Sequence, residues 1–535
     1  MKKVFLLCIL VGLITTMEAK EKKEPVVMTV AGKDIPLSEF IFMAKKDNSV
    51  DFRNKQSVKN YVELYKNFKL KVADAEALTI HEAPRFEEEM EKLGLQLQQS
   101  YLTDKSGEDS VIRIMYERTK NIPVTKQIFF RYPQEMFELQ RIYSTDTLAL
   151  FEKVNDAYTR IQNGESFEAV GKALSNGSDI YFFEKYVYPF MYSFKVVEDY
   201  IYSMRPGDIS GPVRCGTGFY LLKVDSIIPN PGTIRVVHIL SAYPSENPTD
   251  EEIAETRRKS EEIYQKALSN EDFTALAIAF SDDSVNARNG GIIEFRLGEL
   301  LNPFEKAGFA LANIGDISQP FQSRYGYHIL KLTGRKPISS FEDDASYIYN
   351  MMQKSDRFFD LNRSFDERIK TRHGFVFHAE AYEELQRLAN ENFPTDSIFI
   401  SRGLDMEKTL ISIDTLEFSQ SLFVEYLQNR NPLSSQIHVS SPTYSLDLMQ
   451  EVFDYFIRDI LTEVEKRSLV RDYPDYLLQL NEYYDATLLF EISNKRVWSR
   501  AVEEQEQLEA EWVKELNEKY PVTINWKVIK KIKKI

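Results

Sequence analysis

Residues 207–224 read GDISGPVRCGTGFYLLKV and residues 315–332 read GDISQPFQSRYGYHILKL, so one segment of the chain occurs twice. Two further pairs stand upstream in the same order. GESFEAVGKALS (164–175) pairs with NEDFTALAIAFS (270–281), and TKQIFF (125–130) pairs with RVVHIL (235–240). Because three blocks recur in one order at nearly one spacing, the sequence predicts a duplicated domain of about 105 residues.

Each copy combines strand-like and helix-like segments. A short apolar strand opens it, a helical stretch follows, Gly-Asp-Ile-Ser indicates a turn, and a strand with alternating apolar residues closes it. This order predicts an α+β fold. Pro-Asn-Pro-Gly at 229–232 is typical of a linker. It separates the first repeat, residues 124–228, from the second repeat, residues 233–335.

A fainter repeat joins the two ends of the chain. MTVAGKDIPLSEFIFMAKK (28–46) and LISIDTLEFSQSLFVEYLQN (410–429) each have the pattern of a short strand, a turn and an amphipathic helix. A long helical stretch follows each, and further helices are expected over 84–118 and 474–519. We interpret the two as copies of one helical module that flanks the central repeats and whose halves pack together. The alternative is that any two amphipathic helices look alike.

Composition limits the possible functions. The 535 residues are 43% hydrophobic and 28% charged, which predicts about three to five folded domains. Lys and Arg number 67 against 82 Asp and Glu, a formal net charge of −15, and this argues against nucleic-acid binding, which needs a basic surface. Two Cys and six scattered His predict no disulfide framework and no metal site. We expect no cofactor.

The N-terminus has the pattern of an export signal. Lys2 and Lys3 precede an apolar run over 4–14, and Ala19 offers a small residue at a cleavage site. We predict a signal peptide over 1–19, with a buried N-terminal helix as the alternative. This run is too short to span a bilayer, and no later stretch is long and apolar enough. An exported chain without a membrane span and with few cysteines indicates the bacterial periplasm.

The second repeat resembles the parvulin family of peptidyl-prolyl cis-trans isomerases. The family's motifs follow one another in the family's order through the whole repeat. They are HIL in the opening strand, DF-x-x-LA, Ser-Asp-Asp, GG-x-x-x-F, a helix with F-E-x-A-x-F-x-L, G-D-I-S-x-P and finally G-Y-H-I. The resemblance is specific because it rests on all of these motifs together.

The resemblance implies a site in the second repeat. The family's paired histidines fall on His238 and His328, and its acidic or cysteine position falls on Asp283. The remaining positions are Ser323 or Tyr325 for the polar residue before the last histidine, Leu300 and Phe304 for the proline pocket, and Ile292 at its rim. Leu300 replaces the usual Met, and Ile293-Glu294 replaces a Gly-containing pair near Asp283.

Such residues suit the chemistry. Rotation about a prolyl amide has a barrier of about 18–20 kcal/mol, and no bond to the substrate breaks. An apolar socket of Leu300 and Phe304 holds the ring, and a polar floor of His238, Asp283 and His328 favours the twisted amide. This requires three distant segments to converge. The alternative is that the two histidines only fill the interior of a sheet.

The first repeat looks like the same fold without this polar floor. Gln127 stands at the position of His238, and Tyr220 stands at that of His328. We therefore predict little or no isomerase activity there. Aromatic residues follow, and they are interpreted either as a surface that binds extended chains or as core. They are Phe182, Phe183, Tyr186, Tyr188, Phe190, Tyr192 and Phe194.

The whole layout resembles the SurA and PpiD class of periplasmic folding factors, in an extended form. The resemblance implies a helical chaperone domain over 20–123, a degenerate parvulin domain over 124–228, an isomerase domain over 233–335 and a helical region over 336–535. It implies an isomerase and chaperone whose partners are unfolded, proline-containing clients, among them outer-membrane proteins. The alternative is a non-catalytic, ATP-independent holdase or scaffold that uses the parvulin units as docking surfaces.

Overall fold

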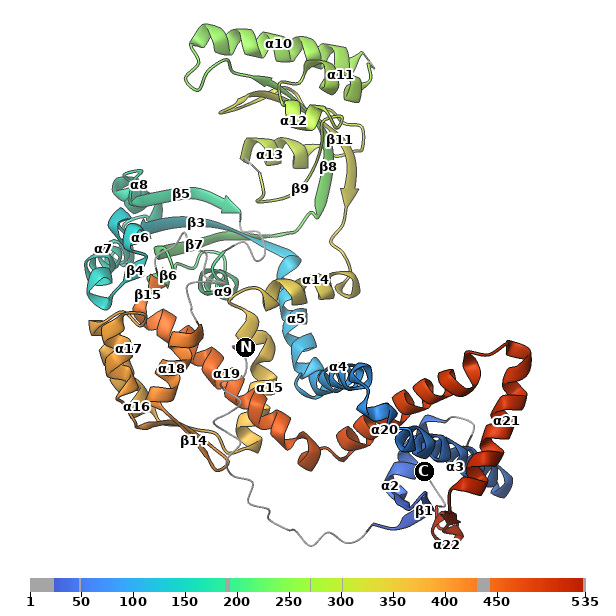
Figure 1. Cartoon of the computed structure of the whole chain (residues 1–535). Helices are drawn as coiled ribbons and strands as arrows, with labels where there is room; N and C mark the ends of the chain where they lie inside the picture. The colour runs from blue at the N-terminus through green and yellow to red at the C-terminus, as the bar shows by residue number, and fades with distance from the viewer. Residues whose placement is uncertain are drawn as a thin grey trace. The chain divides into compact units, whose positions relative to one another are not determined.

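The computed structural model describes residues 24–47, 50–187, 193–269, 271–300, 302–430 and 443–532. The predicted signal peptide, 1–19, lies outside them. The chain divides into two compact units, which we call the terminal unit and the central unit. The terminal unit combines the described parts of Met1–Leu102 and Glu463–Ile535, and the central unit is Thr103–Thr462. Figure 1 shows the elements of both.

The terminal unit joins both ends of the chain in one small sheet. Its strand order is β16-β1-β2, and Thr29 of β1 pairs with Thr523 of β16. The sheet strands are β1 (Val26–Val30), β2 (Lys33–Pro36) and β16 (Val522–Ile524). The helices of this unit are α2 (Leu37–Lys46), α3 (Lys55–Ala77), α4 (Pro84–Tyr101), α20 (Pro474–Ser493), α21 (Val502–Lys519) and α22 (Trp526–Ile529). A π-helical turn, Asn494–Trp498, follows α20.

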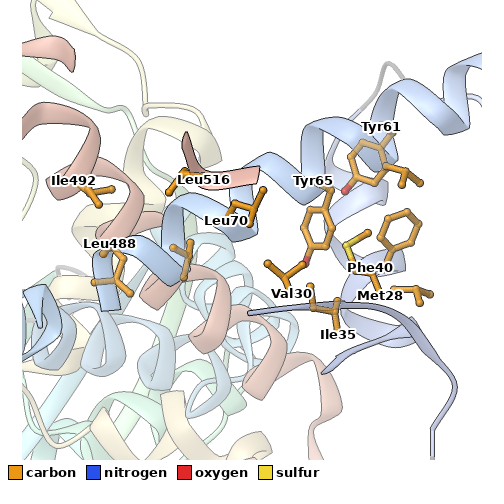
Figure 2. Close-up of a cluster of buried hydrophobic side chains, with 14 of the residues drawn as sticks. Met28, Val30, Ile35, Phe40, Tyr61, Tyr65, Leu70, Leu488, Ile492 and Leu516 are labelled. Carbon is orange, nitrogen blue, oxygen red and sulfur yellow. The ribbon is translucent and has the colours of Figure 1, made fainter. Parts of the chain in front are cut away.

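One apolar core holds this unit together (Figure 2). Phe40 of α2 meets the rings of Tyr61 and Tyr65 of α3 edge-on, with centroids 5.3 and 5.5 Å apart. Leu488 of α20 and Leu516 of α21 are fully buried in the same core. Apolar faces from residues more than 400 positions apart therefore stabilise each other.

A buried carboxylate adds polar contacts to this core. Asp74 of α3 has no exposed surface. It accepts hydrogen bonds from Lys519 Nζ at 2.8 Å, Arg496 at 3.0 Å, and Trp512 Nε1 and Tyr520 Oη at 3.2 Å each. All four donors come from the C-terminal segment, so a single side chain of α3 ties that segment to the N-terminal helices.

Each central repeat forms a four-stranded sheet with the same strand order. The first repeat has β5-β3-β7-β6, and the second has β9-β8-β11-β10, which is the same order when strands are matched along the chain. The strands are β3 (Asn121–Arg131), β5 (Ile180–Val187), β6 (Val213–Cys215), β7 (Gly218–Pro229), β8 (Thr233–Ala242), β9 (Ile292–Arg296), β10 (Phe321–Ser323) and β11 (Gly326–Lys336). The duplication and the α+β fold are thus confirmed.

Corresponding helices accompany the two sheets. In the first repeat they are α7 (Ser144–Gln162), α8 (Phe167–Leu174) and α9 (Lys195–Ser203), and in the second they are α10 (Asp250–Leu268), α11 (Phe273–Phe280), α12 (Ser284–Ala287) and α13 (Asn302–Ala310). β7 ends at Pro229 and β8 begins at Thr233, so the predicted linker is the short connection between the two sheets.

The Gly-Asp-Ile-Ser motif has the same physical role in both repeats. Gly207 and Gly315 adopt positive φ angles of 96° and 101°, which favour glycine. The serine three residues later accepts a hydrogen bond from a main-chain N–H of the closing strand. Ser210 Oγ accepts from Leu222, and Ser318 Oγ accepts from Leu330. The motif recurs because it fixes this turn onto the strand.

The remainder of the central unit contains a second hairpin-and-helix motif. Its sheet has the order β12-β13-β14, which matches β16-β1-β2 of the terminal unit. Each copy of the fainter sequence repeat thus forms a hairpin followed by a helix, but the copies lie in different units. The elements are α5 (Lys105–Thr119), α14 (Phe341–Gln353), α15 (Phe358–Arg372), β12 (Val376–Phe377), α16 (Ala379–Glu391), α17 (Ser397–Leu404), β13 (Thr409–Ile413), β14 (Leu416–Ser419) and α18 (Gln420–Arg430), and α19 (Ser445–Asp472) crosses the unit boundary.

Two long helices expected from the sequence are interrupted. The stretch 84–118 divides into α4 and α5, because Asp104 caps a new helix by accepting the N–H of Gly107. The stretch 474–519 divides at the π-helical turn that separates α20 from α21. None of the helices within the described ranges is long and apolar enough to cross a membrane.

Candidate active site

Two neighbouring strands of the second repeat bring its histidines together. In the antiparallel pairing of β8 and β11, His238 lies opposite Leu330 and His328 lies opposite Leu240. The two histidines are therefore on the same face of the sheet, one pleat apart. Their rings stack with centroids 5.1 Å apart, and His238 Nε2 lies 2.9 Å from His328 Nδ1. Both side chains are 4% exposed.

Asp283 reaches the first histidine from a loop. It is the N-cap of α12, where its carboxylate accepts hydrogen bonds from the backbone N and the side-chain Nδ2 of Asn286. Its Oδ2 lies 3.3 Å from His238 Nδ1. At this separation the carboxylate attracts an N–H on Nδ1 without completing a well-aligned hydrogen bond. The side chain of Asp283 is 19% exposed, more than either histidine.

Ser323 contacts the second histidine. Its Oγ lies 2.6 Å from His328 Nε2 and accepts the N–H of Tyr325 at 3.0 Å. The side chain of Tyr325 is 51% exposed, and its hydroxyl accepts a hydrogen bond from Arg324. Of the two polar candidates before the last histidine, Ser323 is thus the one that contacts it.

One placement of protons satisfies all of these contacts. An N–H on His238 Nδ1 faces the Asp283 carboxylate, so His238 Nε2 accepts from His328 Nδ1–H. His328 Nε2 then accepts from the hydroxyl of Ser323. The four side chains form a single directed chain of contacts with two neutral imidazoles. We call it the polar chain.

The electrostatics agree with neutral imidazoles. Burial lowers the pKa of His238 to about 4, although the nearby Asp283 carboxylate favours the charged form. Burial, together with the neighbouring His238, lowers the pKa of His328 to about 4. Burial opposes ionisation of Asp283, but hydrogen bonds from Asn286 outweigh it and lower its pKa below the usual range. At neutral pH the site holds one negative charge beside two neutral rings.

Aromatic side chains surround the imidazoles. Phe304 of α13 is 6% exposed and meets the rings of His238 and His328 edge-on, at 5.1 and 5.7 Å. Phe321 of β10 stacks on His328 at 5.3 Å. Neither Phe321 nor Asn286 was predicted as a site residue from the sequence. Phe321 lies two residues before Ser323, and the strand alternation that puts both on one face was the available signal.

The other two predicted pocket residues are more exposed. Ile292 and Leu300 are each 40% exposed. Ile292 begins β9 and pairs with Val237, the neighbour of His238. Leu300 lies two residues before α13. The structure therefore gathers His238, His328, Asp283, Ser323 and Phe304 in direct contact, and leaves Ile292, Leu300 and Tyr325 as exposed neighbours of this group.

The low pKa values of the two histidines predict how stability depends on pH. An unfolded chain binds protons at histidine near pH 6.5, whereas the folded second repeat resists them down to about pH 4. Stability is therefore full above about pH 6.5 and is lost as the pH falls towards 4. We expect hydrogen-exchange protection of the Ile239 amide to fall across this window. His328→Gln should flatten the dependence, and an unchanged slope would contradict the assignment.

The first repeat has the same framework without the polar chain. Gln127 lies opposite Leu222, and Tyr220 lies opposite Phe129, so they occupy the positions of His238 and His328 in the sheet. Cys215 pairs with Gly218 as Ser323 pairs with Gly326. Gln127 Nε2 donates to Thr125 Oγ1, within its own strand. The three positions cannot form the chain of contacts found in the second repeat.

The aromatic residues of the first repeat divide between core and surface. Phe182 packs against Phe167, and Tyr186 packs against a buried cluster around Val197. Phe183 and Phe194 are 37% and 36% exposed. Tyr188, Phe190 and Tyr192 lie outside the described residues. The described part of this group therefore has two exposed aromatic side chains rather than one continuous face.

Comparison with known proteins agrees with the geometry. Residues 128–226 and 238–334 match the Rotamase family model, described as the PPIC-type PPIASE domain. Both repeats are thus parvulin-type rotamase domains. Chaperone SurA of Chromohalobacter salexigens is 31% identical over 198 residues, 34% of this chain and 43% of that protein. Foldase protein PrsA 4 of Bacillus cereus is 34% identical over 103 residues, 19% of this chain and 36% of that protein.

The similarity is local. The chain spans less than half the length of Chaperone SurA from Chromohalobacter salexigens. Among solved structures, the parvulin NmPin of Nitrosopumilus maritimus is 33% identical and covers 19% of this chain and 97% of its own, with a TM-score of 0.16. PrsA of Bacillus cereus is 29% identical and covers 26% of this chain and 50% of its own, with a TM-score of 0.19.

Proposed function

We propose that this chain, which carries two PPIC-type rotamase domains, is a periplasmic peptidyl-prolyl cis-trans isomerase and chaperone. Its clients are unfolded, proline-containing polypeptides, outer-membrane proteins among them. The second repeat is the catalytic domain. The polar chain from Asp283 to Ser323 carries the proposal, because the first repeat keeps the same sheet and lacks these side chains.

The site suits amide rotation. In the twisted transition state the amide loses resonance, and electron density shifts from the carbonyl oxygen to the nitrogen. Asp283 is the more exposed end of the polar chain and is the group that faces a bound amide. The two neutral imidazoles and Ser323 fix its partner His238 in one tautomer and orientation, so the charge needs no reorganisation during the reaction. Phe304 and Leu300 hold the prolyl ring.

The domain boundaries and the compartment belong to the same proposal. We place a helical chaperone domain at 20–123, the two rotamase domains at 124–228 and 233–335, and a helical region with a second chaperone-like module at 336–535. A cleaved signal peptide over 1–19 would deliver the chain to the periplasm. The basic start and the short apolar run of this segment support export.

A second candidate function is a holdase or scaffold without catalysis. The observation that favours it is the first repeat, which keeps the rotamase fold although Gln127, Tyr220 and Cys215 replace both histidines and the serine of the site. A domain retained without its catalytic groups is more easily explained by binding than by chemistry. In this alternative both repeats only dock client segments.

One matched pair of variants tests the proposal. In a protease-coupled assay with a proline tetrapeptide, the full chain should accelerate cis-to-trans conversion. His238→Leu should lower the rate at least tenfold, because it breaks the polar chain at its centre. Gln127→Leu alters the corresponding position of the first repeat and should leave the rate unchanged. Suppression of client aggregation should persist in both. No acceleration by the wild type would favour the non-catalytic alternative, and equal accelerated rates in all three proteins would contradict the role of the polar chain in catalysis.

A further inference from the structure

A buried glutamate holds the loop beside the proline pocket. Glu305 of α13 is 5% exposed. Its Oε1 accepts two main-chain hydrogen bonds, from the N–H of Gly298 at 2.7 Å and of Leu300 at 2.8 Å. Burial raises the pKa of this carboxyl group, and the main-chain donors oppose that rise. Burying a carboxyl group is costly, so the two donors compensate for its lost hydration.

The position of Glu305 links the two sides of the pocket. The preceding residue, Phe304, contacts both imidazoles with its ring. The loop held by the carboxylate carries Leu300. Gly298 has a φ angle of 95°, a conformation that favours glycine and turns the chain so that both N–H groups reach one oxygen. The Glu305 side chain therefore fixes the distance between the Phe304 ring and the loop that carries the exposed Leu300.

The first repeat offers an internal comparison. α9 and α13 each have nine residues, and Glu198 is the fourth residue of α9, as Glu305 is of α13. Glu198 is fully buried as well. Its Oε1 lies 3.0 Å from Arg357 and 3.5 Å from Arg118, which belong to other parts of the central unit. In the first repeat, which lacks the polar chain, the glutamate at this position of the helix pairs with two arginines.

We propose that Glu305 is the positioning residue of the proline pocket. Its carboxylate holds the Gly298–Leu300 loop against Phe304, so the pocket is formed before substrate arrives. Glu305 itself does not touch the substrate. This inference rests on the proposed isomerase function of the second repeat, and it adds the residue that preorganises the site.

Two substitutions in the full chain test this role. Glu305→Met keeps the volume and removes the acceptor, whereas Glu305→Gln keeps a side-chain oxygen that can accept the same N–H groups. We expect Glu305→Met to raise KM about tenfold with kcat within about a factor of two, because the polar chain is intact. Glu305→Gln should restore KM to within about threefold of the wild type. The control is Lys306→Ala, which removes an exposed charged side chain from the same helix and should leave KM within about twofold of the wild type.

Hydrogen exchange provides a readout that does not need activity. The amides of Gly298 and Leu300 should be protected in the wild type and in Glu305→Gln, and should exchange at least tenfold faster in Glu305→Met. This comparison remains valid if the wild type shows no isomerase activity, in which case only the proposed function fails. Unchanged protection in Glu305→Met would overturn the inference. An unfolded second repeat in that variant, or a Glu305→Gln variant as impaired as Glu305→Met, would also overturn it.

Discussion

Asp283→Ala should lower kcat/KM for prolyl isomerisation about 100-fold, the size of effect found when one preorganised electrostatic group is removed from an active site. Asp283 is the carboxylate of the polar chain, whose other members are His238, His328 and Ser323. Its charge is secured by a lowered pKa and by two hydrogen bonds from Asn286. Without it, His238 loses the group that selects its tautomer.

Two control variants separate the effect of the Asp283 charge from the effect of its role as the N-cap of α12. Asp283 also caps α12, and Asp283→Ser keeps a capping oxygen without a charge. It should be as inactive as Asp283→Ala. The neighbouring Asp282 is 38% exposed and pairs with Lys259 outside the polar chain, so Asp282→Ala should remain within about threefold of the wild type. Full activity in Asp283→Ala would contradict a catalytic role for the carboxylate.

Local sequence patterns were sufficient to predict the duplicated domain. The repeated Gly-Asp-Ile-Ser turn and the alternating strands have the same local cause in both copies, and the family model matches both. The convergence of His238, Asp283 and His328 could also be predicted, because the resemblance fixed which strands neighbour each other. The sequence could not predict that Ser323, and not Tyr325, contacts His328, because this depends on which side chain of the hairpin points towards the histidine.

The pairing of distant segments was harder to predict. The sequence suggested that the two hairpin copies form one module. In the structure each hairpin takes a third strand from elsewhere: β16 pairs with β1, and β12 pairs with β13. β12 and β16 have only two and three residues, too few to show a periodic pattern. Val376 of β12 pairs with Ser412, and Thr523 of β16 pairs with Thr29, so both pairings join residues far apart in the sequence, which no local motif reports.

Asp74→Ala should destabilise the terminal unit by about 3 kcal/mol, at the lower end of the range for breaking a buried ion pair. The substitution leaves the N–H of Trp512, a residue that is 3% exposed, without an acceptor. Lys519 and Arg496 are 44% and 33% exposed and can be hydrated instead, which limits the loss. Because the C-terminal donors are linked to α3 through this carboxylate, both ends of the chain should loosen together.

Tryptophan fluorescence measures this unit alone. The three tryptophans of the chain, Trp498, Trp512 and Trp526, all lie in the terminal unit. In urea their transition should shift to a lower midpoint in Asp74→Ala, while hydrogen exchange at Ile239 in the second repeat stays unchanged. Glu63→Ala removes an exposed acid of the same helix and should change stability by less than about 0.5 kcal/mol.

The pH dependence of the urea transition tests whether the charge of Asp74 stabilises the terminal unit. The pKa of Asp74 lies below its usual range, because hydrogen bonds from Lys519 and Trp512 outweigh the effect of burial. The stabilisation is therefore present in full above the ordinary carboxyl pKa of about 3.9, and it is lost progressively as the pH falls below that value towards the lower pKa of the folded state. The difference in stability between wild type and Asp74→Ala should shrink over that range. A difference that does not decrease at all as the pH falls below about 3.9 would mean that shape, and not charge, makes Asp74 necessary.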